Sequence, residues 1–167
     1  MEPTGETNGP SDLAQAFIAL TRALQRREVE YLLVGGMAVN FHGLVRATED
    51  IDIFVRPTAE NVRRLKAALR DVWDDPCIEE ITVEDLAGDY PVVRYGPPTG
   101  DFVVDLMARV GELFSFDDLE GSVFDRDGVS IHVATPLTLY RMKRDTVRYH
   151  DKADAQVLKE KFGLEDE

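Results

Sequence analysis

The sequence predicts a mixed α/β fold in which short apolar strands alternate with amphipathic helices. Tyr31–Val34 is an apolar β-type run that ends at a glycine pair, Asp50–Val55 alternates carboxylates with apolar residues, and leucine stripes at helical spacing flank both runs. With 167 residues, 44% of them apolar and 31% charged, the chain can bury one sizeable core but hardly a second. We therefore expect residues 1–10 to form a flexible leader and residues 11–167 to form one domain without internal repeats.

Apolar stripes define the helices in the first half of the chain. Ser11 or Asp12 can cap a first helix, and a second opens at Pro57-Thr58 and ends at Asp74-Asp75-Pro76, because proline restricts the residue before it. The apolar residues of both helices recur every three or four positions, so they face a core. The stripes are Leu13, Phe17, Leu20 and Leu24, then Val62, Leu65, Leu69, Val72 and Trp73.

Turn-rich segments divide the second half of the chain into hairpins and helices. Asp127-Gly128 is typical of a tight hairpin turn, and Gly96–Gly100 is rich in glycine and proline. We expect each of these turns to join two strands. In chain order the predicted elements are the strands Pro91–Tyr95, Phe102–Met107, Gly121–Phe124 and Val129–Val133, and the helices Pro136–Val147 and Asp151–Lys161.

Asp50 and Asp52 are the most informative residues of the chain. Strand residues two apart point to the same face, so both carboxylates project opposite to Ile51 and Ile53. Their negative charges repel each other unless a cation lies between them. Oxygen-only ligands suit Mg²⁺, which takes one or two carboxylates and completes its octahedron with water and substrate phosphates. The pattern alone also fits a solvated acidic edge strand, so the neighbouring residues decide.

Two neighbouring segments favour the metal site. Gly35-Gly36 follows a strand, where it lets the backbone come close to a ligand and directs free helix N–H groups at an anion. Asp105 is a single carboxylate in the apolar middle of its strand, so it needs a partner. Only a short helix and a loop separate the glycine pair from Asp50. The glycine turn and the carboxylates can therefore meet at one edge of a sheet.

In combination, these residues resemble the signature of the DNA polymerase beta-like nucleotidyltransferase superfamily, which is a glycine pair or Gly-Ser, an Asp-x-Asp and a later single Asp. The match runs from about Tyr31 to Met107. It is most similar to the minimal bacterial enzymes that include AbiEii-type toxins and the aminoglycoside and lincosamide nucleotidyltransferases. The resemblance implies a nucleotidyltransferase fold, with a mixed twisted sheet, helices packed on one side and a short C-terminal helical cap.

The resemblance also implies a site that uses two Mg²⁺ ions and an NTP. The ions would stabilise the charge of an in-line displacement at the α-phosphorus. Asp105 is the expected acceptor of the proton that the attacking hydroxyl loses. The implied catalytic and metal-binding residues are Asp50, Asp52 and Asp105, and the implied nucleotide-binding residues are Gly35, Gly36, Arg46, Thr48 and Lys143.

Several of these assignments have alternatives. Many family members have serine where this chain has Gly36, which offers a phosphate its N–H but no hydroxyl. Arg46 and Thr48 can steady phosphates, or Arg46 can pair with a carboxylate while Thr48 caps a turn. Toxin-type relatives use a lysine on a C-terminal helix to reach the phosphates, which here points to Lys143. Arg144 and Arg148 are the alternatives to Lys143 for this role, and Asp151 or Asp154 would orient the lysine. His42 is expected to cap a helix end.

The charge distribution restricts the partners. A formal net charge of −13 counts against a broad nucleic-acid surface, because affinity for a phosphate backbone rests on lysine and arginine. The segment Arg141–Lys152 nevertheless has five basic and two acidic residues, a local balance of +3. It either neutralises the protein's own carboxylates or binds phosphate. We expect a single-stranded RNA 3′ end at most, and no extended duplex.

The acceptor is left open between an RNA 3′ end, a small hydroxylated molecule and a protein side chain. The alternative to an enzyme is a catalytically silent nucleotide-binding or antitoxin-like protein that keeps the fold for interaction. Such a protein has no need for three carboxylates that repel one another. Cys77 is the one cysteine, so it forms no internal disulfide. The chain has no apolar run of membrane length and no signal core at Met1–Pro10, which predicts a cytoplasmic protein.

Overall fold

A six-stranded mixed sheet forms the centre of the computed structural model, which describes residues 12–44, 48–87, 92–108, 116–144 and 149–164. The strands are β1 (Tyr31–Val34), β2 (Asp50–Val55), β3 (Val92–Tyr95), β4 (Val103–Met107), β5 (Gly121–Arg126) and β6 (Val129–Ala134). Their order across the sheet is β3-β4-β2-β1-β6-β5. The pairs β2–β4 and β1–β6 are parallel, and the other three pairs are antiparallel.

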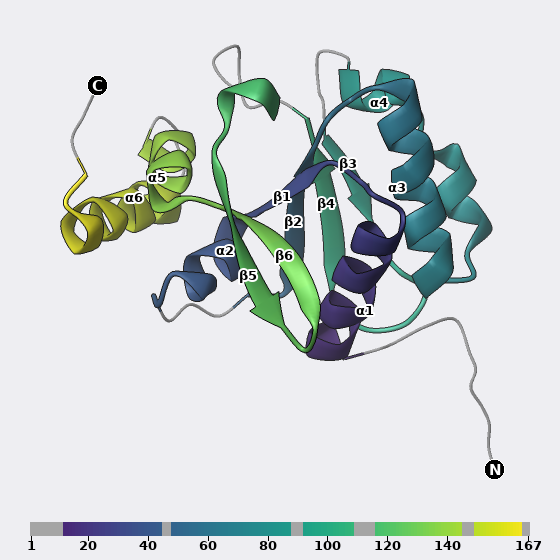
Figure 1. Cartoon of the computed structure of the whole chain (residues 1–167), viewed down its shortest axis with the longest axis horizontal. Helices are drawn as coiled ribbons and strands as arrows, with labels where there is room; N and C mark the ends of the chain where they lie inside the picture. The colour runs from purple at the N-terminus through teal and green to yellow at the C-terminus, as the bar shows by residue number, and fades with distance from the viewer. Residues whose placement is uncertain (1–11, 45–47, 88–91, 109–115, 145–148, 165–167) are drawn as a thin grey trace.

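Helices of different lengths accompany this sheet. They are α1 (Leu13–Arg26), α2 (Gly35–Phe41), α3 (Ala59–Val72), α4 (Val83–Ala87), α5 (Pro136–Arg144) and α6 (Tyr149–Phe162), with short 3₁₀ helices η1 (Pro76–Glu80) and η2 (Phe116–Asp118). Figure 1 shows α1 and α3 together on one side of the sheet, while α5 and α6 form a separate pair at the C-terminal end. The predicted mixed sheet, helical layer and C-terminal helical cap are therefore confirmed.

Local sequence signals explain where the first helices begin. The Asp12 carboxylate accepts a hydrogen bond from the Ala14 N–H at 3.3 Å, so Asp12 caps α1, while Ser11 lies outside the described residues. The Thr58 hydroxyl caps α3 by accepting from the Asn61 N–H at 3.2 Å. The predicted leader, residues 1–10, also lies outside the described residues, so its separation from the domain stays a prediction.

Trp73 differs from the prediction. It is not part of α3, because its backbone is extended (φ −126°, ψ 134°) and it forms the C-cap of that helix. Its indole is fully buried against the rings of Tyr95 and Phe102, with ring centroids 5.8 and 6.2 Å away. Contacts with distant residues therefore set the conformation here. The following Asp75 caps η1, a short helix that the apolar pattern did not predict.

The predicted hairpin between β5 and β6 is confirmed, with Asp127 and Gly128 as its two turn residues. Both have positive φ, 53° and 78°, as a type I′ turn requires. Near the C-terminus, α6 begins at Tyr149, two residues before the predicted start. In α5 the described helix ends at Arg144, and the remaining predicted residues up to Val147 lie outside the described part.

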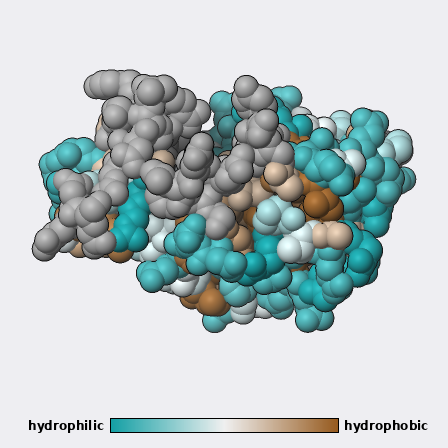
Figure 2. All heavy atoms as spheres, turned by 90° about the horizontal axis from the view of Figure 1, so that it is seen from above, coloured by the Kyte–Doolittle hydropathy of each residue, from teal (hydrophilic) through white to brown (hydrophobic). Residues whose placement is uncertain are grey.

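The surface of the described residues is largely polar. Figure 2 shows one face, on which hydrophobic residues form small groups among hydrophilic ones. Within the described segments, no helix has both the length and the apolarity needed to cross a membrane. The described apolar residues from all main elements form one core, which includes Leu20, Ile51, Leu65 and Leu106.

Candidate active site

The carboxylates of Asp50, Asp52 and Asp105 lie together at the centre of the sheet. Each offers one oxygen, and these oxygens are all within 4.8 Å of one another. Asp52 and Asp105 are direct partners in the parallel pair of β2 and β4, while Asp50 stands opposite Val103. Asp105 is only 8% exposed, and the other two are half-buried. The predicted convergence is thus present, and the role of the three residues as metal ligands stays a prediction.

Strand alternation explains why these side chains share a face. Ile51 and Ile53 in β2, and Val104 and Leu106 in β4, are at most 1% exposed and fill the core on the other face. Because the two strands are parallel neighbours, their polar positions come into line across the sheet. Met107 follows Asp105 by two positions in β4, so strand alternation directs both side chains to the same face.

Gly35 lies directly against this cluster. It joins β1 to α2 and has a φ of +73°, a left-handed conformation that favours glycine. A Cβ on Gly35 would be 2.1 Å from Asp52 Oδ2 and 2.9 Å from Asp52 Cβ. Glycine is therefore required for two reasons, the backbone conformation and the close approach of Asp52. The turn and the carboxylates therefore lie side by side, as the sequence predicts, and the role of Gly35 in nucleotide binding stays a prediction.

Thr48 holds the beginning of the carboxylate strand. Its hydroxyl accepts a hydrogen bond from the Asp50 N–H at 3.3 Å and donates one to the Asp50 carbonyl at 3.1 Å. These contacts are the ones expected of the turn-capping alternative. In the described structure, Thr48 therefore acts on Asp50 by fixing its backbone.

Arg94 is a residue of this site that sequence reasoning missed. It lies on β3 directly opposite Asp105, and its Nε and Nη2 donate to the two Asp105 oxygens at 3.0 and 3.2 Å. The hydrogen bonds and charge of Asp105, and then the charges of Asp50 and Asp52, raise the pKa of the Arg94 guanidinium. Among the described residues of the site, Arg94 is therefore a cation that interacts with all three carboxylates.

A hairpin signal indicated that β3 and β4 pair, but no signal in the sequence gave their register. The connection between them spans residues 96–102, which is too long for one turn type to fix which residues face each other. The pairing of Arg94 with Asp105 depends on that register. Only the assembled sheet shows it.

The predicted basic residues are described only in part. Arg46 and Arg148 lie outside the described residues. Lys143 and Arg144 belong to α5, but their side chains are not among those described, and the same holds for Asp151 and Asp154 in α6. The backbone nevertheless places α5 in contact with α2, the helix that begins at Gly35.

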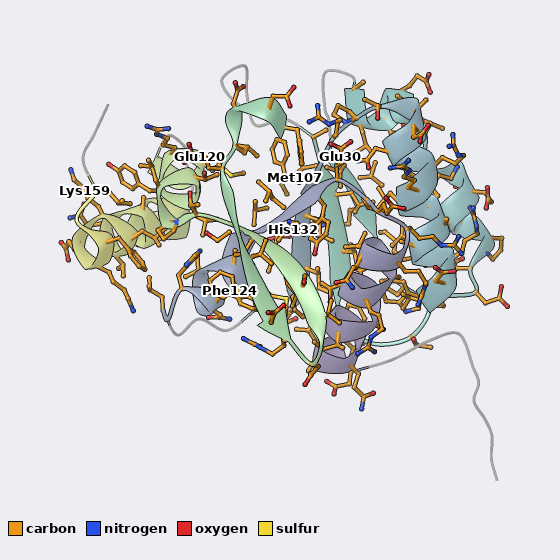
Figure 3. All side chains as sticks on the ribbon, viewed as in Figure 1. Glu30, Met107, Glu120, Phe124, His132 and Lys159 are labelled. Atoms are coloured by element: carbon orange, nitrogen blue, oxygen red, sulfur yellow. The ribbon has the colours of Figure 1, made fainter. Side chains whose placement is uncertain are left out.

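His42 has a structural position, as expected. It is the C-cap of α2, and its Nε2 lies 2.8 Å from the Ala134 carbonyl. Its ring also meets the edges of Phe124, labelled in Figure 3, and Phe162. These contacts tie the end of α2 to β5, β6 and α6. His42 is therefore a packing residue of the scaffold.

The donor set fits a hard divalent cation. All three donors are carboxylates on the two adjacent parallel strands β2 and β4, and Gly35 leaves the space beside Asp52 without a side chain. Oxygen donors of this kind suit Mg²⁺ or Mn²⁺ better than the softer metals, which prefer nitrogen or sulfur. The described part of the chain offers no second group of three or more such residues that could hold a metal ion.

Comparison with known proteins assigns this arrangement to a family. The family model described as nucleotidyl transferase AbiEii toxin, type IV toxin–antitoxin system, matches residues 18–156. The fold is similar to the crystal structure of ANT(2″)-Ia in complex with adenylyl-2″-tobramycin, with a TM-score of 0.51, 18% identity and 90% coverage of both chains. No curated protein sequence matches. The match to the AbiEii model covers most of the chain, the carboxylates and Gly35 included, so this nucleotidyltransferase belongs to the AbiEii toxin family.

Proposed function

We propose that the protein transfers a nucleoside monophosphate from a Mg²⁺-bound NTP to the hydroxyl of an acceptor in the cytoplasm, with release of pyrophosphate. The convergence of Asp50, Asp52 and Asp105 beside Gly35 carries this proposal. Three carboxylates whose oxygens lie within 4.8 Å repel one another. A divalent cation bound among them would offset that repulsion.

Each carboxylate has a role that follows from its place. Asp50 and Asp52, on one strand and half-buried, would hold both of two Mg²⁺ ions, and Asp105 would hold one of them. When bound, the ions would supply charge stabilisation for the displacement and favour the ionised form of the acceptor hydroxyl. Rigid strands suit this role, because small displacements of ligands strongly reduce activity.

Asp105 would take part in the transfer step by accepting a proton. The acceptor hydroxyl gives its proton to the carboxylate of Asp105, and its oxygen forms a new bond to the α-phosphorus. The bond between that phosphorus and the oxygen bridging to the β-phosphate breaks, and its electron pair leaves with pyrophosphate. Asp105 is suited to receive the proton because the pairing of β2 and β4 fixes it directly opposite Asp52, beside the proposed metal ions.

The triphosphate would lie between the glycine turn and the C-terminal helices. Gly35 brings backbone close to Asp52, and α5, which carries Lys143, contacts the helix α2 that begins at Gly35. This arrangement supports Lys143 as the phosphate-binding lysine. Arg46 is the second proposed phosphate ligand, and Thr48 contributes by positioning Asp50.

One transfer assay tests the reaction and its acceptor together. The purified protein is incubated with α-labelled NTPs and Mg²⁺, with RNA, lysate protein or hydroxylated small molecules as separate acceptors. We expect label to move from the NTP to one acceptor class and pyrophosphate to be released in equal amount. Label that stays in the NTP with all three classes would contradict the proposal and favour the catalytically silent alternative.

A melting experiment tests the metal site without an acceptor. Millimolar Mg²⁺ should raise the melting temperature of the wild type, since only the folded chain brings the carboxylates together. At an ion concentration of 100 times Kd, linkage gives about 2.7 kcal/mol of stabilisation. Asp52→Asn should lose the shift, and the matched control Asp101→Asn should keep it, because Asp101 is exposed and precedes β4. Equal shifts in both variants would place the bound ion elsewhere.

A further inference from the structure

Arg94 forms an ion pair with the most buried carboxylate of the site. Its guanidinium binds Asp105 through two nitrogens, and both carboxylate oxygens accept a hydrogen bond, at 3.0 and 3.2 Å. The two residues are direct cross-strand partners in β3 and β4, so the strands themselves set their distance. The pairing of β3 and β4 therefore fixes this contact, and no loop conformation is needed for it.

The same carboxylate also faces the other two. Asp105 is the cross-strand partner of Asp52 on its other side, so Asp52, Asp105 and Arg94 form one row across β2, β4 and β3. A metal ion held by the three carboxylates would bind one Asp105 oxygen, and the Arg94 guanidinium donates to both Asp105 oxygens, so the two cations share this carboxylate. Two cations that share one carboxylate repel each other, so each weakens the binding of the other.

Arg94 can leave this contact easily. β3 is the outermost strand at its end of the sheet, and the Arg94 side chain is 68% exposed, whereas that of Asp105 is 11% exposed. Moving the guanidinium into solvent needs no repacking of the core. The buried partner stays in place, and the exposed partner is the one that can move.

We propose that Arg94 is a built-in counter-ion that competes with divalent metal for Asp105, and so sets the metal concentration at which the enzyme becomes loaded. This inference rests on the proposed function, since it assigns metal to the three carboxylates. In the metal-free protein, Arg94 neutralises and orients Asp105. When metal binds, the guanidinium gives up at least part of its contact. Arg94 is thus a positioning residue that lowers metal affinity while it stabilises the empty site.

Metal affinity tests the inference directly. Mn²⁺ binding is measured without nucleotide for the wild type, Arg94→Met and Arg94→Lys. We expect Arg94→Met to bind Mn²⁺ about three- to tenfold more tightly, the range for loss of an exposed but two-pronged ion pair. Arg94→Lys should fall between the two, since lysine keeps the charge but not the planar pair of donors.

A matched control separates this contact from general charge. Arg63 on α3 is 69% exposed and pairs with Glu60, so Arg63→Met removes an equally exposed cation that does not contact Asp105. We expect its Mn²⁺ affinity to change less than about twofold, because salt screens distant surface charges. The melting temperature gives a second readout. In EDTA, Arg94→Met should melt lower than the wild type, and Mg²⁺ should raise its melting temperature by more.

The outcomes are distinct. Tighter Mn²⁺ binding in Arg94→Met but not in Arg63→Met supports the inference. Unchanged or weaker binding in Arg94→Met, or an equal gain in both variants, overturns it and leaves the proposed function standing. If the wild type binds no Mn²⁺, the proposed metal site fails as well. If circular dichroism shows that Arg94→Met is unfolded, the Mn²⁺ affinity of Arg94→Lys becomes the test. An affinity about twofold higher than that of the wild type supports competition, and an unchanged affinity refutes it.

Discussion

Replacing Gly35 by alanine should disturb the site and the fold together. The left-handed φ of +73° costs an alanine about 1–2 kcal/mol. The new methyl group would also lie 2.1 Å from Asp52 Oδ2, 2.8 Å from Cγ and 2.9 Å from Cβ. Rotating the Asp52 side chain moves the first two atoms but not Cβ, so the backbone of α2 or β2 must also shift. Overpacking of this kind costs about 1–3 kcal/mol, which gives a total of about 2–5 kcal/mol.

Gly128 provides a matched control for the backbone term. Its φ is +78°, and a Cβ there would have no heavy atom within 4 Å. Gly128→Ala should therefore cost only the conformational part, about 1–2 kcal/mol.

Urea unfolding in EDTA measures both stabilities, and Mn²⁺ binding then reports on the position of Asp52. Gly35→Ala should be the less stable variant and should bind Mn²⁺ at least about tenfold more weakly, whereas Gly128→Ala should bind it as the wild type does. Equal destabilisation of the two variants, or unchanged Mn²⁺ binding in Gly35→Ala, would refute the reasoning that Gly35 makes room for Asp52.

Two further predictions concern stability. The buried Asn61 amide bonds the Glu30 N–H, the Glu30 carbonyl and the Arg56 carbonyl at 2.7, 3.0 and 2.9 Å, so Asn61→Ala should cost about 2–4 kcal/mol in urea unfolding. The exposed Gln156→Ala should cost less than about 0.5 kcal/mol, and similar losses would contradict the reasoning. Burial raises the pKa of the Tyr31 phenol from 10.0 to about 12. The protonated phenol therefore contributes to the free energy of unfolding fully below pH 10, and this contribution is lost as the pH rises to 12. Over that range the free energy of unfolding should fall more steeply in the wild type than in Tyr31→Phe, by about 1.4 kcal/mol per pH unit. Parallel curves of this free energy against pH would exclude Tyr31 as the cause.

The sequence by itself determined the elements and the candidate chemistry of this protein. Alternation in Asp50–Val55 predicted a strand with two carboxylates on one face, and the structure has that strand with the same bounds. Asp127-Gly128 predicted a hairpin turn, and Thr58 marked the start of α3. These signals are readable because side-chain periodicity, capping and turn conformation depend on residues only a few positions apart.

Other features depended on contacts between distant residues. Trp73 leaves the helix because it packs against Tyr95 and Phe102, which its apolar stripe does not reveal. Thr48 bonds the backbone of Asp50, whereas the sequence left it open between that role and a phosphate contact. In each case the local pattern allowed more than one conformation, and tertiary packing selected one.

The tertiary structure alone decided how the site is completed. Gly35 touches Asp52 because β1 and β2 pair so that Val34 faces Asp52, which brings the turn after β1 against that carboxylate. Arg94 reaches Asp105 because β3 and β4 pair in one register, and a shift by one residue would turn Arg94 to the opposite face. A strand's sequence specifies which residues alternate, but its register is set by the whole sheet, so the cation beside the three carboxylates could be found only there.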